Sequence, residues 1–252
     1  MYSYSSIDSK EDLAANIGVT VKQITGILYG IGIGPGDPEH ITLKAAKMIR
    51  EVDVIAAPGK DVKETTAYKI AVQAVPEIEQ KELLPIYMPM VLDKEEIVKE
   101  HKRGAQMLEK VLSEGKNIGF ITLGDPTVYS TYSYVEKIVK DDGFETRYIS
   151  GITSFCASAA ALGVPLSEWQ EPLHIIPAVH QLDDKLALDG NYVLMKSGKQ
   201  MAAVKQILRE SGRKVKMVEN CGLSNEKKYG SVDEIPDDAA YFSLIIAKEN
   251  KE

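Results

Sequence analysis

The sequence predicts an α/β protein of two domains, with a mainly parallel sheet in the N-terminal domain and a mixed sheet in the C-terminal domain. From Ile27 onward, apolar runs of strand length alternate with amphipathic segments of helical period. After Ser150 this alternation gives way to several strand-like runs with one long helix among them. The 252 residues are enough for two domains that each bury a core. We therefore expect an extension over residues 1–25 and domains over residues 26–149 and 150–252.

The N-terminal domain is expected to contain five strands in the runs "ILYGIGIG", "VIAAP", "KELLPIYMPM", "NIGFITLGDPT" and "FETRYIS". Pro85 and Pro89 place the third run at a sheet edge, because proline cannot donate to a neighbouring strand. Helices are expected in "EHITLKAAKMIREV", "TTAYKIAVQAV", "DKEEIVKEHKRGAQMLEKVLSEGK" and "YSTYSYVEKIVKDDG". The third of these starts at a capping box of Asp93 and Glu96 and ends at Gly115. Strands alternating with helices imply a parallel sheet covered on both faces. The first helix is expected to bury one face, formed by Ile41, Ala45, Met48, Ile49 and Val52.

The C-terminal domain is expected to begin near Ser150 and Gly151 with a helix of small residues in "GITSFCASAAALGVP". Strands are expected in "LHIIPAV", "NYVLMKS", "KVKMVEN" and "YFSLIIAK", and one long helix in "KQMAAVKQILRESG". One crossover helix for four strands predicts a mixed sheet. The two domains should be tightly apposed, because no Gly/Ser-rich linker separates them.

The first residues have neither the basic flank and apolar core of a secretory signal nor a cleavage site, so we expect a cytoplasmic protein. Ser9 with Asp12 resembles a helix cap, and Ala14, Gly18 and Ile24 stand at offsets like those of a helix-turn-helix. A DNA reader needs a complete recognition helix on a packed bundle, and Ile27 already begins a strand. A short surface helix is the alternative.

Composition disfavours several classes of function. The net charge of −7 opposes nonspecific binding to nucleic acids or membranes, which needs a positive field. Cys156 and Cys221 stand far apart, which argues against a disulfide framework and a thiolate metal site. The four histidines show no ligand spacing. We therefore expect no metal held by the protein.

The stretch "YGIGIGPGDPEHIT" (29–42) has the glycines of a dinucleotide-binding loop but not their spacing. In the pattern G-x-G-x-x-G, a start at Gly32 puts the third glycine at Asp37, and a start at Gly34 puts it at Glu39. Both carboxylates would repel a pyrophosphate at the helix start. Asp37 as a cap, followed by Pro38, instead fits a helix start. A ligand with a positive centre near the carboxylates, such as the sulfonium of S-adenosylmethionine, or a ligand that approaches only the glycine backbone suits this loop better. A purely structural glycine turn is the alternative.

A second Gly-Asp-Pro loop, "TLGDPTVYSTYSY" (122–134), follows the fourth strand, where open α/β sheets bind ligands. With "SGITSF" at the domain junction, the two loops resemble those of the tetrapyrrole methylase family, two-domain class III methyltransferases that use S-adenosylmethionine. The resemblance extends from Gly26 to Lys248. The segments "GDPTVYSTYSY", "HIIPAV", "YVLMKSGK", "MVENCG" and "YFSLIIAK" look most like members that methylate carbon 20 of precorrin-2, or its cobalt-loaded counterpart, in cobalamin synthesis.

The resemblance implies a cofactor site and a homodimer. Family members that methylate uroporphyrinogen have an aspartate after the second strand, where this chain has "IAAPGK", so that reaction is disfavoured. By resemblance, Pro35 lies beside the cofactor, and the second loop lines its amino-acid and ribose portions with Leu123, Gly124, Asp125 and Val128. Thr153 and Ser154 contact it from the junction. Met195 and Gly222 complete the pocket near the adenine, with Leu244 or its neighbours behind them.

For the reaction we expect alignment of the methyl group with an enamine-like meso carbon to matter more than side-chain catalysis. Tyr129 is the candidate catalytic residue, because its hydroxyl could orient the macrocycle or help to remove a proton; helix packing is the alternative. Lys60, Lys196 and Lys199 are candidates for binding the carboxylates of the substrate. Competing hypotheses are a family member that acts at another corrin position or on protein or RNA, an NAD-dependent oxidoreductase, and a DNA-binding regulator.

Overall fold

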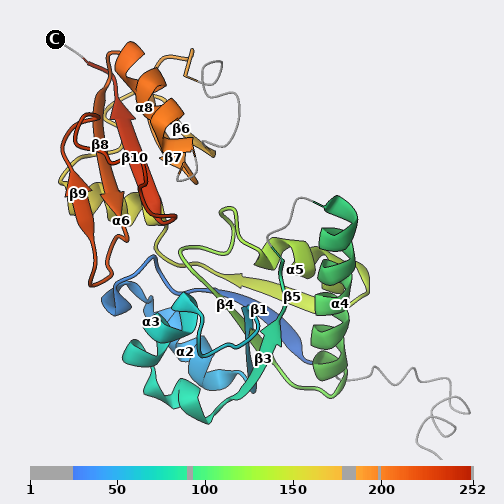
Figure 1. Cartoon of the computed structure of the whole chain (residues 1–252). Helices are drawn as coiled ribbons and strands as arrows, with labels where there is room; N and C mark the ends of the chain where they lie inside the picture. Colours follow the sequence, from blue (N-terminus) through green and yellow to red (C-terminus); the bar gives the residue numbers. More distant parts are fainter. Residues whose placement is uncertain (1–24, 90–92, 178–185, 198–199, 251–252) are drawn as a thin grey trace, which may run out of the picture.

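The computed structural model describes residues 25–89, 93–177, 186–197 and 200–250, which form two five-stranded sheets with helices on both faces (Figure 1). No helix within these ranges is long and apolar enough to cross a membrane. The N-terminal helix cap and the helix-turn-helix interpretation fall outside the described residues and stay predictions. The division into domains at residue 150 also stays a prediction.

The first sheet is parallel throughout and has the order β3-β2-β4-β1-β5. The predicted parallel sheet is therefore confirmed. Its inner strands are buried along nearly their whole length, because helices cover both faces. The third strand lies at an edge, as its Pro85 predicts. The strands are β1 (Ile27–Gly32), β2 (Val54–Pro58), β3 (Glu82–Ile86), β4 (Ile118–Thr122) and β5 (Glu145–Ile149).

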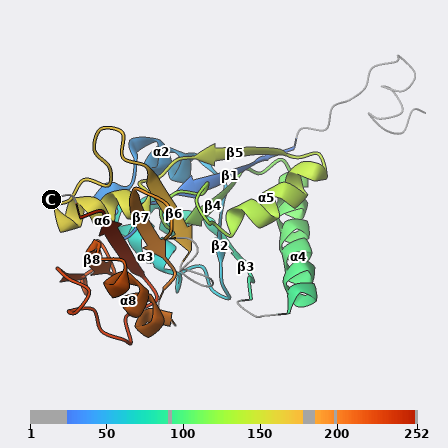
Figure 2. The same ribbon diagram turned by 90° about the horizontal axis from the view of Figure 1, so that it is seen from above.

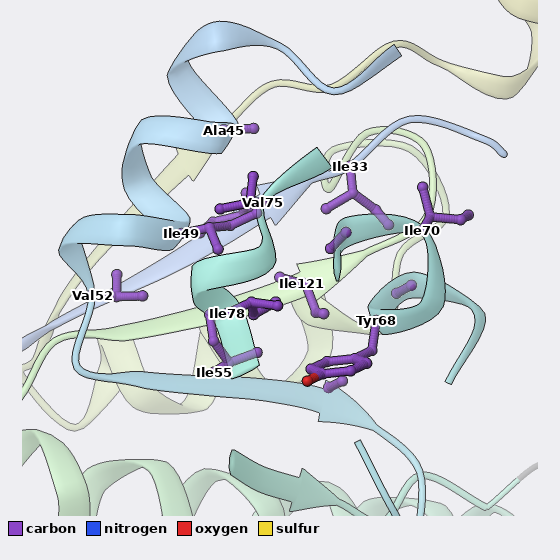
Figure 3. Packing of buried hydrophobic residues seen from close by; sticks show 14 of the residues in the cluster. Ile33, Ala45, Ile49, Val52, Ile55, Tyr68, Ile70, Val75, Ile78 and Ile121 are labelled. Atoms are coloured by element: carbon purple, nitrogen blue, oxygen red, sulfur yellow. The ribbon is translucent and has the colours of Figure 1, made fainter. Parts of the chain in front are cut away.

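Two layers of helices enclose this sheet (Figure 2). One face is covered by α2 (Leu43–Glu51), α3 (Thr66–Ala74) and η2 (Pro76–Gln80), and the other by α4 (Lys94–Ser113) and α5 (Tyr132–Asp141). Figure 3 shows the first of these cores, in which side chains from α2, α3 and η2 meet those of β1, β2 and β4. The predicted start of α4 is confirmed, because the Asp93 side chain accepts hydrogen bonds from the backbone of Glu95 and Glu96.

Two helices begin later than the sequence predicts. Asp37 caps only a short 3-10 helix, η1 (Pro38–His40), and Ile41 is extended rather than part of a helical face. The α2 helix then starts afresh, because the Thr42 hydroxyl accepts a hydrogen bond from the Ala45 N–H at 3.1 Å. The α5 helix starts at Tyr132 instead of Tyr129, whose φ of +48° is incompatible with a right-handed helix.

The second sheet is mixed, as predicted, with the order β6-β7-β10-β8-β9. Only β6 and β7 pair in parallel. Sequence analysis missed β9, because three residues of "KKY" are too short and too polar to give a strand pattern. The strands are β6 (Leu173–Pro177), β7 (Asn191–Met195), β8 (Lys214–Glu219), β9 (Lys227–Tyr229) and β10 (Ser243–Lys248).

Opposite faces of the second sheet carry α8 (Met201–Glu210) and α6 (Ser154–Leu162). The α6 helix is the predicted small-residue helix, and it ends at Gly163 in the left-handed conformation. Because α6 directly follows β5 in the chain but packs on β8 and β10, residues 150–153 carry the chain from the first sheet to the second (Figure 1).

Candidate active site

Three loops meet at one edge of the first sheet, where the parallel strands β1, β4 and β5 end. The register pairs Gly32 with Thr122 and Ile31 with Ile149, so the three strands end at nearly the same level. The loops over residues 33–37, 123–131 and 150–153 therefore leave from neighbouring points. This is the edge at which open α/β sheets bind ligands.

Glycines allow these loops to touch through their backbones. The Gly124 N–H donates to the Gly34 carbonyl at 2.8 Å, and the Gly34 N–H donates back at 3.3 Å. A Cβ atom on Gly151 would lie 2.2 Å from the Gly124 carbonyl oxygen and 2.7 Å from the carbonyl carbon of Gly32. A side chain at residue 151 would thus force the loops apart.

Asp125 links the second of these loops to the junction. It is buried, and its Oδ2 accepts a hydrogen bond from the Gly151 N–H at 3.0 Å. Its Oδ1 accepts from both the N–H and the hydroxyl of Thr127. Both carboxylate oxygens are thus engaged by the chain itself. Asp125 therefore stabilises the conformation of the loop.

The loop after β8 brings the second sheet against the first. A Cβ atom on Gly36 would lie 2.1 Å from the Cys221 carbonyl oxygen, and one on Gly222 would lie 2.5 Å from the Asp37 nitrogen. The next residue, Leu223, packs against the first core of the first sheet. The Gly222 N–H donates to Glu226 Oε2 at 2.7 Å and lowers the pKa of that carboxyl group.

The start of α6 presents unsatisfied polar groups to the same region. Thr153 occupies the cap position, but its side chain does not cap the helix. Its Oγ1 is buried and has no hydrogen-bond partner in the described part of the chain. Gly124 lies close by, since a Cβ atom there would be 3.7 Å from the Ser154 nitrogen. Buried polar groups are rarely left unpaired, so this hydroxyl indicates a ligand contact.

An apolar surface adjoins the start of α6. Met195, the last residue of β7, pairs in register with Leu244 of β10. Leu244 is buried in the core between the second sheet and α6, and both Met195 and Phe155 of α6 pack against that core. Met195 and Phe155 are among the partly exposed side chains of this cluster, and apolar side chains of this kind suit the face of an aromatic ring.

Tyr129 lies across the junction of the two sheets. Its hydroxyl donates to the Ile175 carbonyl of β6 at 3.2 Å, although the residue belongs to the loop after β4. Lys196, directly after β7, places its Nζ 5.3 Å from the centre of the Tyr129 ring. Both residues have positive φ, +48° for Tyr129 and +62° for Lys196. Strained backbone of this kind concentrates at functional sites.

The structure places the predicted cofactor-binding residues on the three loops, at the start of α6, on the loop after β8 and on β7 and β10. Pro35 stands within the first loop, and Val128 donates its N–H to the Asp125 carbonyl in the second loop. Leu123 packs partly into the first core. Lys60 follows β2, and its Nζ lies 5.9 Å from the ring of Tyr87, which follows β3. Lys199 falls outside the described residues.

Sequence analysis missed several residues that build the site, among them Gly36, Gly151, Cys221 and Ile175. Gly36 belongs to the stretch 29–42 and Gly151 to "SGITSF". The clustering of glycines in these two segments could have predicted close contacts between loop backbones. Ile175 contributes only a backbone carbonyl, which leaves no signal in its residue type. Within the described ranges, no group of three or more histidine, cysteine, aspartate or glutamate residues is arranged to hold a metal ion.

Comparison with known proteins gives a consistent result. The sequence profile of the tetrapyrrole (corrin/porphyrin) methylases matches residues 27–236. A probable cobalt-precorrin-2 C(20)-methyltransferase of Methanocaldococcus jannaschii is 37% identical over 228 residues, which cover 89% of this chain and 96% of that protein. The cobalt-precorrin-2 C(20)-methyltransferase of Salmonella typhimurium is 29% identical, covering 91% of this chain and 99% of that protein.

The fold is also similar to that of solved structures. One of them is a uroporphyrin-III C-methyltransferase from Thermus thermophilus in complex with S-adenosylhomocysteine. It superposes with a TM-score of 0.63 and 18% identity, covering 89% of this chain and 98% of that one. At this identity the likeness shows the fold.

Proposed function

The chain belongs to the tetrapyrrole (corrin/porphyrin) methylase family, and from this we propose that it transfers a methyl group from S-adenosylmethionine to carbon 20 of precorrin-2 or of its cobalt-loaded form, cobalt-factor II, in cobalamin biosynthesis. The observation that carries the proposal is the 37% identity with the M. jannaschii protein over 89% of the chain. The family uses S-adenosylmethionine. The homodimer and the cytoplasmic location stay predictions.

The residues of the candidate site fit S-adenosylmethionine. The unpartnered Thr153 hydroxyl and the uncapped start of α6 offer hydrogen bonds to polar parts of the cofactor. The glycine contacts among the loops allow a ligand to approach the backbone closely. Met195 supplies an apolar contact for the adenine, with the buried Leu244 behind it. We propose that the ten predicted binding residues act at this site. Among them, Asp125 acts by stabilising the conformation of the second loop.

When bound, S-adenosylmethionine supplies a methyl group that its sulfonium centre already makes electrophilic. The chain then has to hold the macrocycle so that its meso carbon faces this group, and to exclude water. The contacts of Gly36 with Cys221 and of Tyr129 with Ile175 join the two sheets on either side of the site. Because the Tyr129 hydroxyl donates a hydrogen bond to a carbonyl oxygen, an orienting role is favoured over that of a base.

Incubation with labelled S-adenosylmethionine and either precorrin-2 or cobalt-factor II tests the proposal. Label should appear on carbon 20, read by NMR of the isolated product. Label on another carbon would favour a different reaction of the same family. Absence of transfer to both tetrapyrroles, with a folded protein that binds S-adenosylhomocysteine, would refute the proposed substrate.

Replacing Tyr129 by phenylalanine should lower kcat by about tenfold, because the ring stays but its hydrogen bond to β6 is lost. Steady-state kinetics with both substrates measure the change. Tyr134, an exposed tyrosine on α5 that stacks on His101, gives the matched control Tyr134→Phe, for which kcat should stay unchanged. Normal turnover of Tyr129→Phe would exclude a catalytic or orienting role for the hydroxyl.

The two cysteines should report occupancy of the site. Burial raises the pKa of the Cys221 thiol, although a hydrogen bond from Ser158 acts in the opposite direction, whereas Cys156 is exposed. An aromatic disulfide reagent should therefore react with Cys221 at least about tenfold more slowly than with Cys156, because attack requires an accessible thiolate. S-Adenosylhomocysteine should slow the reaction of Cys221 further in a Cys156→Ser variant. Equal rates with and without this ligand would place the cofactor elsewhere.

A further inference from the structure

We infer that Lys196 binds a carboxylate of the tetrapyrrole substrate, held in place for this by Tyr129. The inference rests on the proposed function, because a precorrin carries several acidic side chains. Lys196 immediately follows Met195, so it stands where the proposed cofactor site borders the space between the two sheets. Its ammonium group comes from the second sheet and lies over a tyrosine of the first.

The backbone around Lys196 is the first observation. Its φ of +62° is uncommon for a residue with a side chain and costs free energy relative to glycine. The next residue, Ser197, is fully buried and its hydroxyl has no hydrogen-bond partner among the described residues. Two successive residues that each carry an unfavourable feature indicate that the end of β7 serves binding rather than stability.

The second observation is the Tyr129 ring, over which the ammonium group of Lys196 lies. The Tyr129 hydroxyl is anchored to the Ile175 carbonyl, which fixes the ring below Lys196. Tyr129 is 48% exposed, so one part of its ring remains open to solvent beside the lysine. A cation over an aromatic face keeps its capacity to donate hydrogen bonds to an anion. Tyr129 is thus a positioning residue for Lys196.

Charge is the third observation. Some lysines of the described chain, such as Lys69 and Lys205, pair with carboxylates, whereas Lys196 forms no ion pair there and lies over the Tyr129 ring instead. The whole chain has a net charge of −7, which repels a polycarboxylate. A cation without an internal partner at the junction of the sheets supplies the local attraction that the rest of the surface lacks. Lys60 also forms no ion pair among the described residues, but its aromatic partner Tyr87 follows β3 of the same sheet, so this contact does not join the two sheets.

Equilibrium binding tests the inference. Binding of cobalt-factor II (cobalt-sirohydrochlorin) is measured by absorbance, and binding of S-adenosylhomocysteine by calorimetry. Lys196→Met should weaken binding of the tetrapyrrole about tenfold, and added salt should weaken the remaining binding less than in the wild type. Affinity for S-adenosylhomocysteine should change less than twofold, since the cofactor contacts lie on other residues. Lys196→Arg should keep most of the tetrapyrrole affinity. Lys110→Met, which removes an exposed lysine of α4, is the control and should match the wild type.

A second variant separates binding from folding. Lys196→Gly relieves the left-handed backbone, so its Tm should equal or exceed that of the wild type while tetrapyrrole binding falls as in Lys196→Met. Unchanged tetrapyrrole affinity in Lys196→Met, an equal loss for S-adenosylhomocysteine, or a larger loss in Lys60→Met would overturn the inference. Failure of the proposed function would appear differently, as a wild type that binds S-adenosylhomocysteine but not the tetrapyrrole.

Discussion

Replacing Gly36 by alanine is expected to reduce methyl transfer by about a hundredfold or more. The new Cβ atom would stand 2.1 Å from the Cys221 carbonyl oxygen and 3.0 Å from the Gly222 carbonyl carbon, both of them backbone atoms. The loop after β8 would have to retreat by about 1 Å, and misplacement of that size in a reacting complex costs about two orders of magnitude in rate. Steady-state kinetics with labelled S-adenosylmethionine measure the loss.

Stability should fall much less than activity in this variant, because the clash lies between the two sheets and not within either core. Overpacking typically costs about 1–3 kcal/mol, which for a chain of this size lowers Tm by roughly 2–12 °C. Gly230→Ala is the matched control, since a Cβ atom there would meet only the Glu234 side chain, at 3.5 Å, and it should keep full activity. Equal activities of the two variants would show that the close approach at Gly36 is not needed for catalysis.

Replacing Asp125 by asparagine should destabilise the protein and weaken binding of S-adenosylmethionine. The buried carboxylate accepts hydrogen bonds from Gly151 on one oxygen and from Thr127 on the other. In asparagine, one of these oxygens becomes an NH₂ group, which faces an N–H or hydroxyl donor. Loss of a charge-assisted hydrogen bond at a buried site costs about 2 kcal/mol, or roughly 4–8 °C in Tm. Calorimetric titration should show affinity for S-adenosylhomocysteine reduced by about tenfold.

Asp93→Asn provides the matched control for this prediction. Asp93 also accepts hydrogen bonds from two backbone N–H groups, but it is an exposed cap of α4, where asparagine serves nearly as well. Its Tm should therefore change by less than about 2 °C. If Asp125→Asn were as stable as Asp93→Asn and bound the ligand normally, the proposed role of Asp125 in shaping the loop would be wrong.

Much of the fold was predictable because local patterns and burial coincide. The runs that became β1, β2 and β4 are apolar throughout, which is what a strand covered by helices on both faces requires. Pro85 correctly marked an edge strand. The two helix starts were predicted wrongly because one residue overrides a periodic pattern. The Thr42 cap starts α2 one residue after Ile41, whose spacing to Ala45 had placed it in the helix. The positive φ of Tyr129 delays α5 in the same way.

Hydrophobic period, turn residues and contiguous motifs are enough to predict the class of each sheet, the two Gly-Asp-Pro loops and the family. The contacts of Gly36 with Cys221, of Asp125 with Gly151 and of Lys196 with Tyr129 became visible only in the folded chain. Lys196 and Tyr129 belong to different sheets, so no local pattern links them. Gly36 approaches the backbone of Cys221, and Asp125 accepts a hydrogen bond from the backbone N–H of Gly151. Backbone N–H and carbonyl groups are the same in almost every residue, so their pairing is set by how the sheets pack and not by residue type.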